Sequence, residues 1–240
     1  MGETEAEIQA EPRPQRQSAS ASLAGGRPEE IFRSLWASVF YAAPEAPRSV
    51  LVCSANRQEG ATTVACALAL AGAGSVAAPG GESGPDRVVL VDLNLHNPAV
   101  HKQLNLSDGG GVSDVLAGEK PLADVLRHVG PGQLDVLTVG TRRDRVLEVL
   151  RQDRVSNFLA DLERHYGHVI IDTAPANMYP DAQVLAGVVR SAVLVAQSQQ
   201  TARESLQVAR KCIEAGGGKV LGVVLNMRTF PIPSFVYRRV

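Results

Sequence analysis

Residues 49–63 read SVLVCSANRQEGATT, and this stretch decides the fold. Residues Ser49–Cys53 form a largely apolar run without polar alternation, which is typical of a strand covered by helices on both faces. A polar loop, Ser54–Gly60, follows and leads directly into a stretch of helical length from Thr62. A strand, a tight loop and a helix in this order predict the first unit of a parallel α/β sheet.

The same alternation continues along the rest of the chain. Further apolar runs predict strands, and the stretches between them have helical length and period. The predicted strands are Val88–Asp92, Leu134–Val139, Val169–Asp172, Ala192–Ala196 and Val220–Leu225, and the predicted helices are Thr62–Ala73, Arg145–Tyr166 and Thr201–Ala215. We therefore expect one doubly wound α/β domain with a mostly parallel sheet and right-handed crossovers.

The first 28 residues differ in composition from this domain. They consist mainly of Glu, Gln, Pro, Ser, Ala and Gly, with too few large apolar side chains to offset the entropy of ordering, so residues 1–28 are predicted to be a flexible tail. From Glu29 onward, apolar residues recur at steps of three and four, which predicts a helix that ends before Pro44. The folded domain is accordingly expected to span residues 29–240.

The overall composition excludes several classes of protein. A chain of 240 residues with 45% apolar and 20% charged residues and a net charge of −1 lacks the basic excess needed to bind nucleic acid non-specifically. Its three cysteines have neither disulfide nor zinc spacing, which favours a reducing compartment. The longest apolar run is too short to span a bilayer, and the acidic N-terminus is unlike a signal peptide. We expect a cytoplasmic protein that does not bind nucleic acid.

The loop after the first strand has the position and part of the composition of a P-loop. In a P-loop, backbone N–H groups and a helix N-terminus cradle phosphates, a lysine reaches the terminal phosphates, and a hydroxyl binds Mg²⁺. Gly60, Thr62 and Thr63 fit this template, whereas Ala55 replaces its first glycine and Ala61 replaces its lysine. The alternative is an ordinary connection in which Thr62 merely begins a helix.

Two aspartates follow later strands of the predicted sheet. Asp92 ends the run Val88–Asp92 and Asp172 ends the run Val169–Asp172, where carboxylates suit Mg²⁺ or its water ligands. A single strand-end aspartate is more often a helix cap or a turn residue. Because ligands of parallel sheets bind beyond the carboxyl ends of the strands, two such aspartates after a P-loop-like loop predict a phosphate and Mg²⁺ site.

With these motifs, the sequence resembles the bacterial tyrosine kinases of capsule and exopolysaccharide synthesis, the CpsD/CapB group, within the MinD/ParA-like P-loop ATPases. The resemblance covers about residues 28–226. Besides the loop and the two aspartates it rests on shorter motifs, which are Arg27–Arg33, Asn97-Pro98 with His101, Gly111–Gly118, Ile171–Pro175, Asp181-Ala182 and Leu221–Asn226.

The resemblance implies a set of cofactors and site residues. It implies ATP or ADP with Mg²⁺, Asp92 and Asp172 as catalytic residues, and Thr62, Asp92 and Asp172 as metal-binding residues. It also implies that Asn226 lies near the nucleotide base. The residues implied to bind the nucleotide are Asn56, Arg57, Gln58, Glu59, Gly60, Ala61, Thr62, Thr63 and Asn226.

The departures from the family pattern gather at the same site. The family has lysine where this chain has Ala61, a second aspartate where it has Asn94, and arginine where it has His96. The first 101 residues contain no lysine at all. We therefore predict a degenerate, regulatory relative of the kinases that binds ATP without efficient phosphoryl transfer. The alternatives are an active kinase or ATPase with an atypical loop, and a MinD/ParA-like positioning ATPase. From its place in the loop, Arg57 is a candidate substitute cation for nucleotide binding.

The resemblance also implies partners. Glu30 and Arg33 match the first two residues of the oligomerisation motif Glu-x-x-Arg-x-x-Arg, whose third residue is Trp36 here. The segment from Lys219 onward carries four basic residues and no acidic one, together with the lone C-terminal Tyr237. It is either a solvated tail or a docking segment for a membrane-embedded polysaccharide co-polymerase or acidic lipid. Recruitment to the inner face of the membrane would follow from docking.

Overall fold

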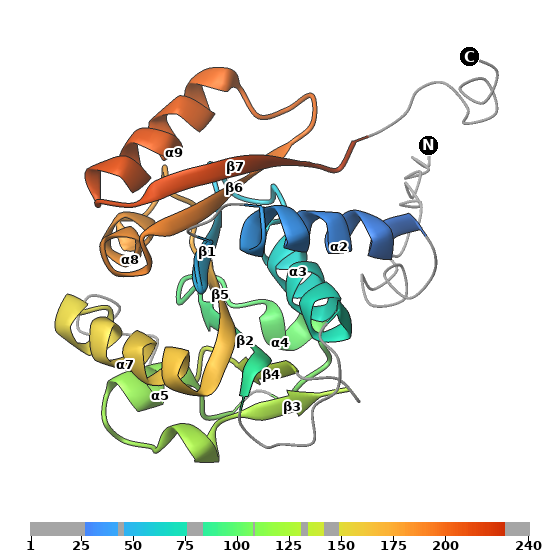
Figure 1. The fold of residues 1–240 in the computed structure, drawn as a ribbon. Coiled ribbons are helices and arrows are strands. Elements are labelled where there is room, and N and C mark those ends of the chain that lie inside the picture. The colour runs from blue at the N-terminus through green and yellow to red at the C-terminus, as the bar shows by residue number, and fades with distance from the viewer. Residues whose placement is uncertain are drawn as a thin grey trace, which may run out of the picture.

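The computed structural model describes residues 27–42, 46–75, 84–107, 109–130, 134–141 and 149–228. Within them, seven strands form one sheet in the order β3-β4-β2-β5-β1-β6-β7 (Figure 1). The strands are β1 Ser49–Ser54, β2 Gly84–Leu93, β3 Arg127–Val129, β4 Leu134–Leu137, β5 Tyr166–Thr173, β6 Ser191–Gln197 and β7 Lys219–Asn226. All neighbouring strands are parallel except β3 and β4, which confirms the predicted mostly parallel α/β sheet.

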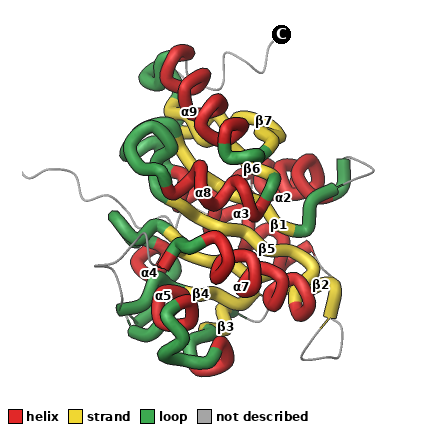
Figure 2. The backbone as a smooth tube through the Cα atoms, turned by 90° about the vertical axis from the view of Figure 1, so that its left-hand side faces the viewer, coloured by secondary structure: helices red, strands yellow, loops and turns green. Residues whose placement is uncertain are grey.

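Helices cover both faces of the sheet, as Figures 1 and 2 show. One face carries α2 Arg27–Phe40, α3 Ala61–Ser75 and α4 Val100–Gln103. The opposite face carries α5 Val112–Leu116, α7 Gln152–His165, α8 Asp181–Val189 and α9 Arg203–Ala215, with a 3₁₀ turn at Leu122–Asp124. Successive strand residues alternate between these layers, because strand side chains point to opposite faces. In β1, Val50 and Val52 pack with α2 and α3, whereas Leu51 and Cys53 pack with α7 and α8.

Some predicted boundaries were wrong. The predicted helix Arg145–Tyr166 contains α7, but Tyr166 is the first residue of β5 and packs in the core. The predicted strand Leu134–Val139 ends at Leu137. Strand β3 was not predicted, since its three residues are too few to show a pattern. The helix predicted from Glu29 begins two residues earlier, at Arg27.

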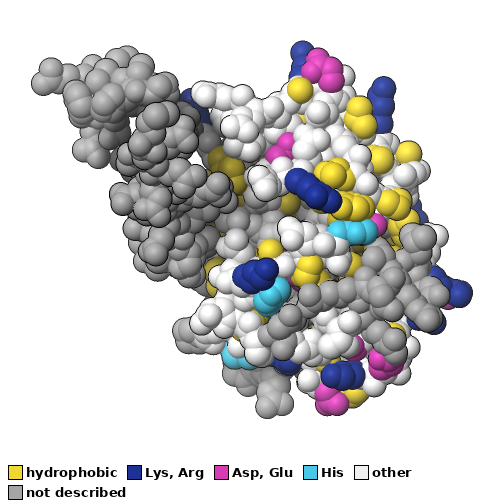
Figure 3. Space-filling view, turned by 180° about the vertical axis from the view of Figure 1, so that it is seen from behind, with side chains coloured by type: hydrophobic (Ala, Val, Ile, Leu, Met, Phe, Trp, Pro, Cys, Tyr) yellow, Lys and Arg dark blue, Asp and Glu magenta, His cyan; other side chains and the backbone are white. Residues whose placement is uncertain are grey.

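Other predictions lie outside the described residues. These are the tail over residues 1–26 and the chain from residue 229 onward, which includes Tyr237. Among the described helices, none is long and apolar enough to cross a membrane. On the face seen in Figure 3, the described basic side chains are scattered among acidic, polar and apolar ones rather than gathered in one patch.

Helix α2 packs on the domain through three buried side chains, Trp36, Val39 and Phe40. Trp36 is only 1% exposed and packs with Phe40, the ring centroids being 4.3 Å apart. Its ring lies directly against the backbone of α3 at Gly72, where a Cβ atom would be 2.2 Å from Trp36 Cζ3. The third position of the predicted oligomerisation motif is therefore a core residue in this chain, while Glu30 and Arg33 are exposed.

The contact between Trp36 and Gly72 yields a stability prediction. Gly72→Ala should lower the free energy of unfolding by about 1 to 3 kcal/mol, the usual cost of overpacking a core. Gly74→Ala is the matched control in the same helix, since its Cβ would meet nothing within 4 Å. It should raise stability by about 0.5 to 1 kcal/mol through helix propensity. Urea denaturation measures the free energy of unfolding of both variants. The same change in both would contradict the close contact between Trp36 and Gly72.

Candidate phosphate and metal site

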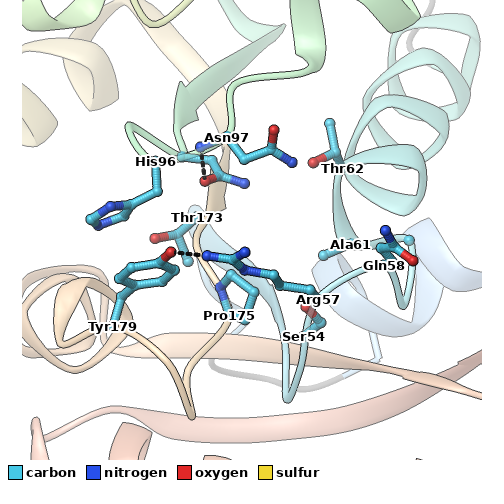
Figure 4. Close-up of a pocket in the computed structure, with 12 residues that line it drawn as sticks. Ser54, Arg57, Gln58, Ala61, Thr62, His96, Asn97, Thr173, Pro175 and Tyr179 are labelled. Atoms are coloured by element: carbon cyan, nitrogen blue, oxygen red, sulfur yellow. Dashed lines mark hydrogen bonds between the residues drawn. The ribbon is translucent and has the colours of Figure 1, made fainter. Parts of the chain in front are cut away.

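A pocket of about 420 Å³ lies beyond the carboxyl ends of β1, β2 and β5, where the topology places ligands (Figure 4). Polar side chains and the loop after β1 form most of its wall. The lining residues are Ser54, Arg57, Gln58, Gly60, Ala61, Thr62, Asn94, His96, Asn97, Thr173, Pro175 and Tyr179. This volume lies in the usual range for small-molecule sites.

The predicted nucleotide-binding residues divide into two groups. One group lines the pocket and comprises Arg57, Gln58, Gly60, Ala61 and Thr62. The other group does not line it and comprises Asn56, Glu59, Thr63 and Asn226. Of these, Thr63 Oγ1 accepts a hydrogen bond of 3.3 Å from Gln103 Nε2. The second group holds the loop and its helix in place rather than facing the pocket.

Glu59 is the centre of the loop's own hydrogen bonds. Its side chain is buried and accepts bonds from the backbone N–H and from Nδ2 of Asn56, both at 2.9 Å. Thr201 Oγ1, from the turn before α9, donates to the same carboxylate at 2.7 Å. A buried carboxylate is tolerated only when hydrogen bonds replace its hydration, so these contacts fix the shape of the loop.

Gly60 ends the loop and needs to be glycine. Its φ is +87°, a conformation that L side chains rarely adopt, and a Cβ atom there would lie 2.2 Å from Asn226 Nδ2. That amide, at the end of β7, donates a 3.0 Å hydrogen bond to the carbonyl of Glu59. Asn226, which was predicted to lie near the nucleotide base, thus supports the loop and does not line the pocket.

Helix α3 starts at Ala61, directly at the pocket. The first turn of any helix has N–H groups without a helical carbonyl to bond, and these groups favour phosphate. Gly60, Ala61 and Thr62 bring this turn to the pocket wall. The side chain at the lysine position is a methyl group, so this turn offers amides but no cation.

The structure brings Thr62 and the two predicted metal-binding aspartates together. Thr62 Oγ1 donates to Asp172 Oδ2 at 2.7 Å, and Asp172 is the direct cross-strand neighbour of Asp92 in the pairing of β5 with β2. Both aspartates are completely buried. Burial, and then the charge of Asp92, raise the pKa of Asp172 well above its ordinary value. Asp172 Oδ1 accepts no hydrogen bond from the described residues.

Asp92 also shapes the loop that follows β2. Its Oδ1 accepts the backbone N–H of Asn94 at 3.1 Å, and its Oδ2 accepts that of Val100 at 3.2 Å. Asn94 Oδ1 in turn accepts the N–H of Asn97. At the position where the family pattern has a second aspartate, Asn94 thus helps to form a turn.

One further side chain at the pocket, that of Tyr179, was not singled out by the sequence. Tyr179, in the loop between β5 and α8, stacks on His96 with ring centroids 3.7 Å apart and planes 13° apart. Arg57 Nη2 donates a hydrogen bond to the hydroxyl of Tyr179. His96 Nε2 lies 3.0 Å from Oδ2 of the buried Asp181. The only available signal was the rule that loops after parallel strands form the site.

These residues fit Mg²⁺ and a phosphorylated ligand. The unpartnered Oδ1 of Asp172 and the hydroxyl of Thr62 are the hard oxygen donors that Mg²⁺ prefers. Within the described ranges, no three His, Cys, Asp or Glu side chains gather closely enough to hold a metal alone. A metal here would need the hydroxyl, water or phosphate oxygens as well, which is usual for Mg²⁺.

A side chain at position 60 would meet two separate penalties, one from the backbone conformation and one from contact with Asn226. Gly60→Ala should cost roughly 2 kcal/mol or more, because it adds a collision with Asn226 to a backbone penalty of about 1 to 2 kcal/mol. Gly118→Ala is the matched control, with φ +77° and open space around the Cβ position, so only the backbone penalty remains. Denaturant unfolding of both variants measures the difference in the free energy of unfolding. Equal decreases in the two variants would show that the contact with Asn226 adds no cost.

The buried Asp172 predicts an unusual pH dependence. Because its pKa is raised in the folded state, its ionisation opposes folding as pH rises above the ordinary value of 3.8. Without Mg²⁺ or nucleotide, Asp172→Asn should therefore be as stable as the wild type near pH 3 and more stable than the wild type at pH 7. Thermal unfolding across this range measures it, and a less stable variant at pH 7 would refute the assignment.

Comparison with known proteins finds similarity to bacterial tyrosine kinases. No protein-family model matches it. It is 29% identical over 140 residues to the putative tyrosine-protein kinase CapB of Staphylococcus aureus, a match that covers 58% of this chain and 61% of that protein. The chain thus spans less than two thirds of this relative.

Solved structures agree with the sequence match. The chimerical protein CapA2B2 has 29% identity and a TM-score of 0.75, with 84% of this chain and 85% of that chain covered. The septum site-determining protein MinD of Pyrococcus horikoshii, complexed with Mg-ADP, has 21% identity and a TM-score of 0.61 over 80% of this chain and 76% of that chain, which shows a shared fold. The chain is therefore a homologue of bacterial tyrosine kinases such as CapB, built on the fold of the MinD-type ATPases.

Proposed function

We propose that this protein is a regulatory, catalytically impaired homologue of the capsule-type tyrosine kinases. It binds ATP or ADP with Mg²⁺ at the pocket and controls capsule or exopolysaccharide synthesis through a partner. One observation carries the proposal, which is that Ala61 begins α3 at the pocket wall where the kinases have a lysine. The loop shape and the buried aspartates are present, and the cation at the first residue of α3 is missing.

Magnitudes separate binding from catalysis in such a site. A hydrogen bond to a charged group contributes roughly 1.5 to 3 kcal/mol, so loss of the lysine weakens nucleotide binding by about ten- to a hundredfold. Phosphoryl transfer depends mainly on electrostatic stabilisation, and loss of one cationic group can cost on the order of 10³ to 10⁵ in rate. Loss of the lysine therefore leaves measurable nucleotide binding but almost no phosphoryl transfer.

Specific residues would hold each part of the ligand. The amides of Gly60, Ala61 and Thr62 would take the phosphates, and Thr62 and Asp172, supported by Asp92, would hold Mg²⁺ directly or through water. Bound Mg²⁺ neutralises charge on the phosphates. Asp92 and Asp172 would be the catalytic residues of any remaining transfer activity. The loop and its helix would be held in place by four residues that do not line the pocket, which are Asn56, Glu59, Thr63 and Asn226.

The partner is proposed from the same relationship. A kinase of capsule synthesis works beside a membrane, so we infer a membrane-embedded co-polymerase as partner and a cytoplasmic protein recruited to the inner face of the membrane. Glu30 and Arg33 are exposed on α2 and available for contact with a second copy. The burial of Trp36 removes the third residue of that motif from any such contact.

Restoring the lysine tests the proposal. Ala61→Lys should bind Mg-ATP about ten- to a hundredfold more tightly than the wild type, since it adds a charged hydrogen bond. It should also gain phosphotyrosine in an antibody assay in which the wild type shows none. Ala37→Lys, on the exposed side of α2, adds the same charge away from the pocket and should change neither result.

Two outcomes would contradict the proposal. Strong phosphotyrosine in the wild type that disappears in Asp92→Ala or Asp172→Ala would show an active kinase with an atypical loop. No gain of affinity in Ala61→Lys, measured by calorimetry on a folded variant, would show that the pocket serves a ligand other than a nucleotide.

A further inference from the structure

The described lining of the pocket carries one permanent positive charge, and this charge lies in the loop at Arg57 rather than at position 61. Arg57 is the only Lys or Arg among the described lining residues, and none of these is Asp or Glu. Figure 4 shows its side chain reaching across the pocket toward Tyr179. Its Nη2 donates to the Tyr179 hydroxyl, and its Cζ lies 5.7 Å from the centre of that ring. Arg57 is exposed, and hydrogen bonding and cation–π attraction orient its guanidinium toward this wall of the pocket.

Tyr179 is itself held by a column of side chains that starts in the core. Its ring stacks on His96, and His96 Nε2 faces Asp181 Oδ2 at 3.0 Å. Asp181 is 2% exposed and is the first residue of α8. The column joins the loop after β2, the loop after β5 and α8. Because its base is buried, the stack gives Tyr179 a fixed place at the pocket wall.

A fixed guanidinium is well suited to bind phosphate. The planar fork of arginine matches phosphate oxygens with two parallel hydrogen bonds, and a side chain already held near its bound position loses little freedom on binding. The first turn of α3, on the other side of the pocket, offers amides but no cation. A phosphorylated ligand between these two walls would contact both.

We propose that Arg57 is the cation that binds the terminal phosphate of a nucleoside di- or triphosphate in this pocket, and that Tyr179, His96 and Asp181 are positioning residues for its guanidinium. The inference rests on the proposed nucleotide-binding function and adds the residue that contacts the terminal phosphate. It also predicts a preference for nucleoside di- and triphosphates over monophosphates, because the shorter ligand leaves Arg57 without a partner.

Calorimetric titration with Mg-ATP, Mg-ADP and AMP tests the role of Arg57. Arg57→Ala should weaken binding of Mg-ATP and Mg-ADP by about ten- to a hundredfold and leave the affinity for AMP unchanged. Arg57→Lys should restore part of the loss, because lysine keeps the charge without the fork. Arg210→Ala removes an arginine that is paired with Glu214 on α9, and it should bind all three ligands as the wild type does.

The column is tested with the same titrations. Tyr179→Phe keeps the ring and removes only the hydroxyl that accepts the bond from Arg57, so it should weaken Mg-ATP by about two- to tenfold with no change for AMP. His96→Asn should act in the same direction. Tyr179→Phe, which keeps the ring and its stacking on His96, should shift the thermal unfolding of the unliganded protein by no more than about 2 °C.

The failures can be told apart. If the wild type and Ala61→Lys both bind no nucleotide, the proposed function and this inference fall together. If Thr62→Ala weakens Mg-ATP while Arg57→Ala does not, the nucleotide site stands and the role of Arg57 is refuted. An equal loss for ATP, ADP and AMP in Arg57→Ala would also refute a contact to the terminal phosphate.

Discussion

The buried carboxylate of Glu59 is the interaction on which the site depends. It accepts hydrogen bonds from Asn56 in its own loop and from Thr201 beyond β6, and its backbone carbonyl accepts one from Asn226 at the end of β7. One residue thus joins the loop after β1 to the two neighbouring strands on one side of it. The left-handed turn at Gly60 and the start of α3 at the pocket follow from this fixed loop.

The sheet and part of the site could be predicted because their signals are local. Continuous apolar runs mark buried parallel strands, and Asp92 and Asp172 stand at the ends of two of them. The role of Glu59 could not be predicted, since its partner Thr201 is 142 residues away in the sequence. The stacking of His96 on Tyr179 also joins residues that are far apart in the sequence, and both residues lie in irregular loops. Strand β3 was missed because three residues show no period.

The site combines features that cost stability with one missing charge. Asp172 is buried beside Asp92 with a raised pKa and an oxygen without a partner among the described residues, and Gly60 holds a backbone conformation that only glycine adopts readily. Such departures from ordinary packing are typical of ligand sites. Ala61 is the exception, because a methyl group there supplies nothing to a phosphate. On these grounds we propose a site that binds its ligand without efficient phosphoryl transfer.

The most direct test of this account is a crystal structure of the wild-type protein grown with saturating Mg-ADP. We expect one nucleotide in this pocket, with its phosphates on the amides of Gly60, Ala61 and Thr62 and a metal ion beside Thr62 and Asp172. An empty pocket at saturating Mg-ADP, or a nucleotide bound elsewhere on the chain, would contradict the claim that a nucleotide site persists here without its lysine.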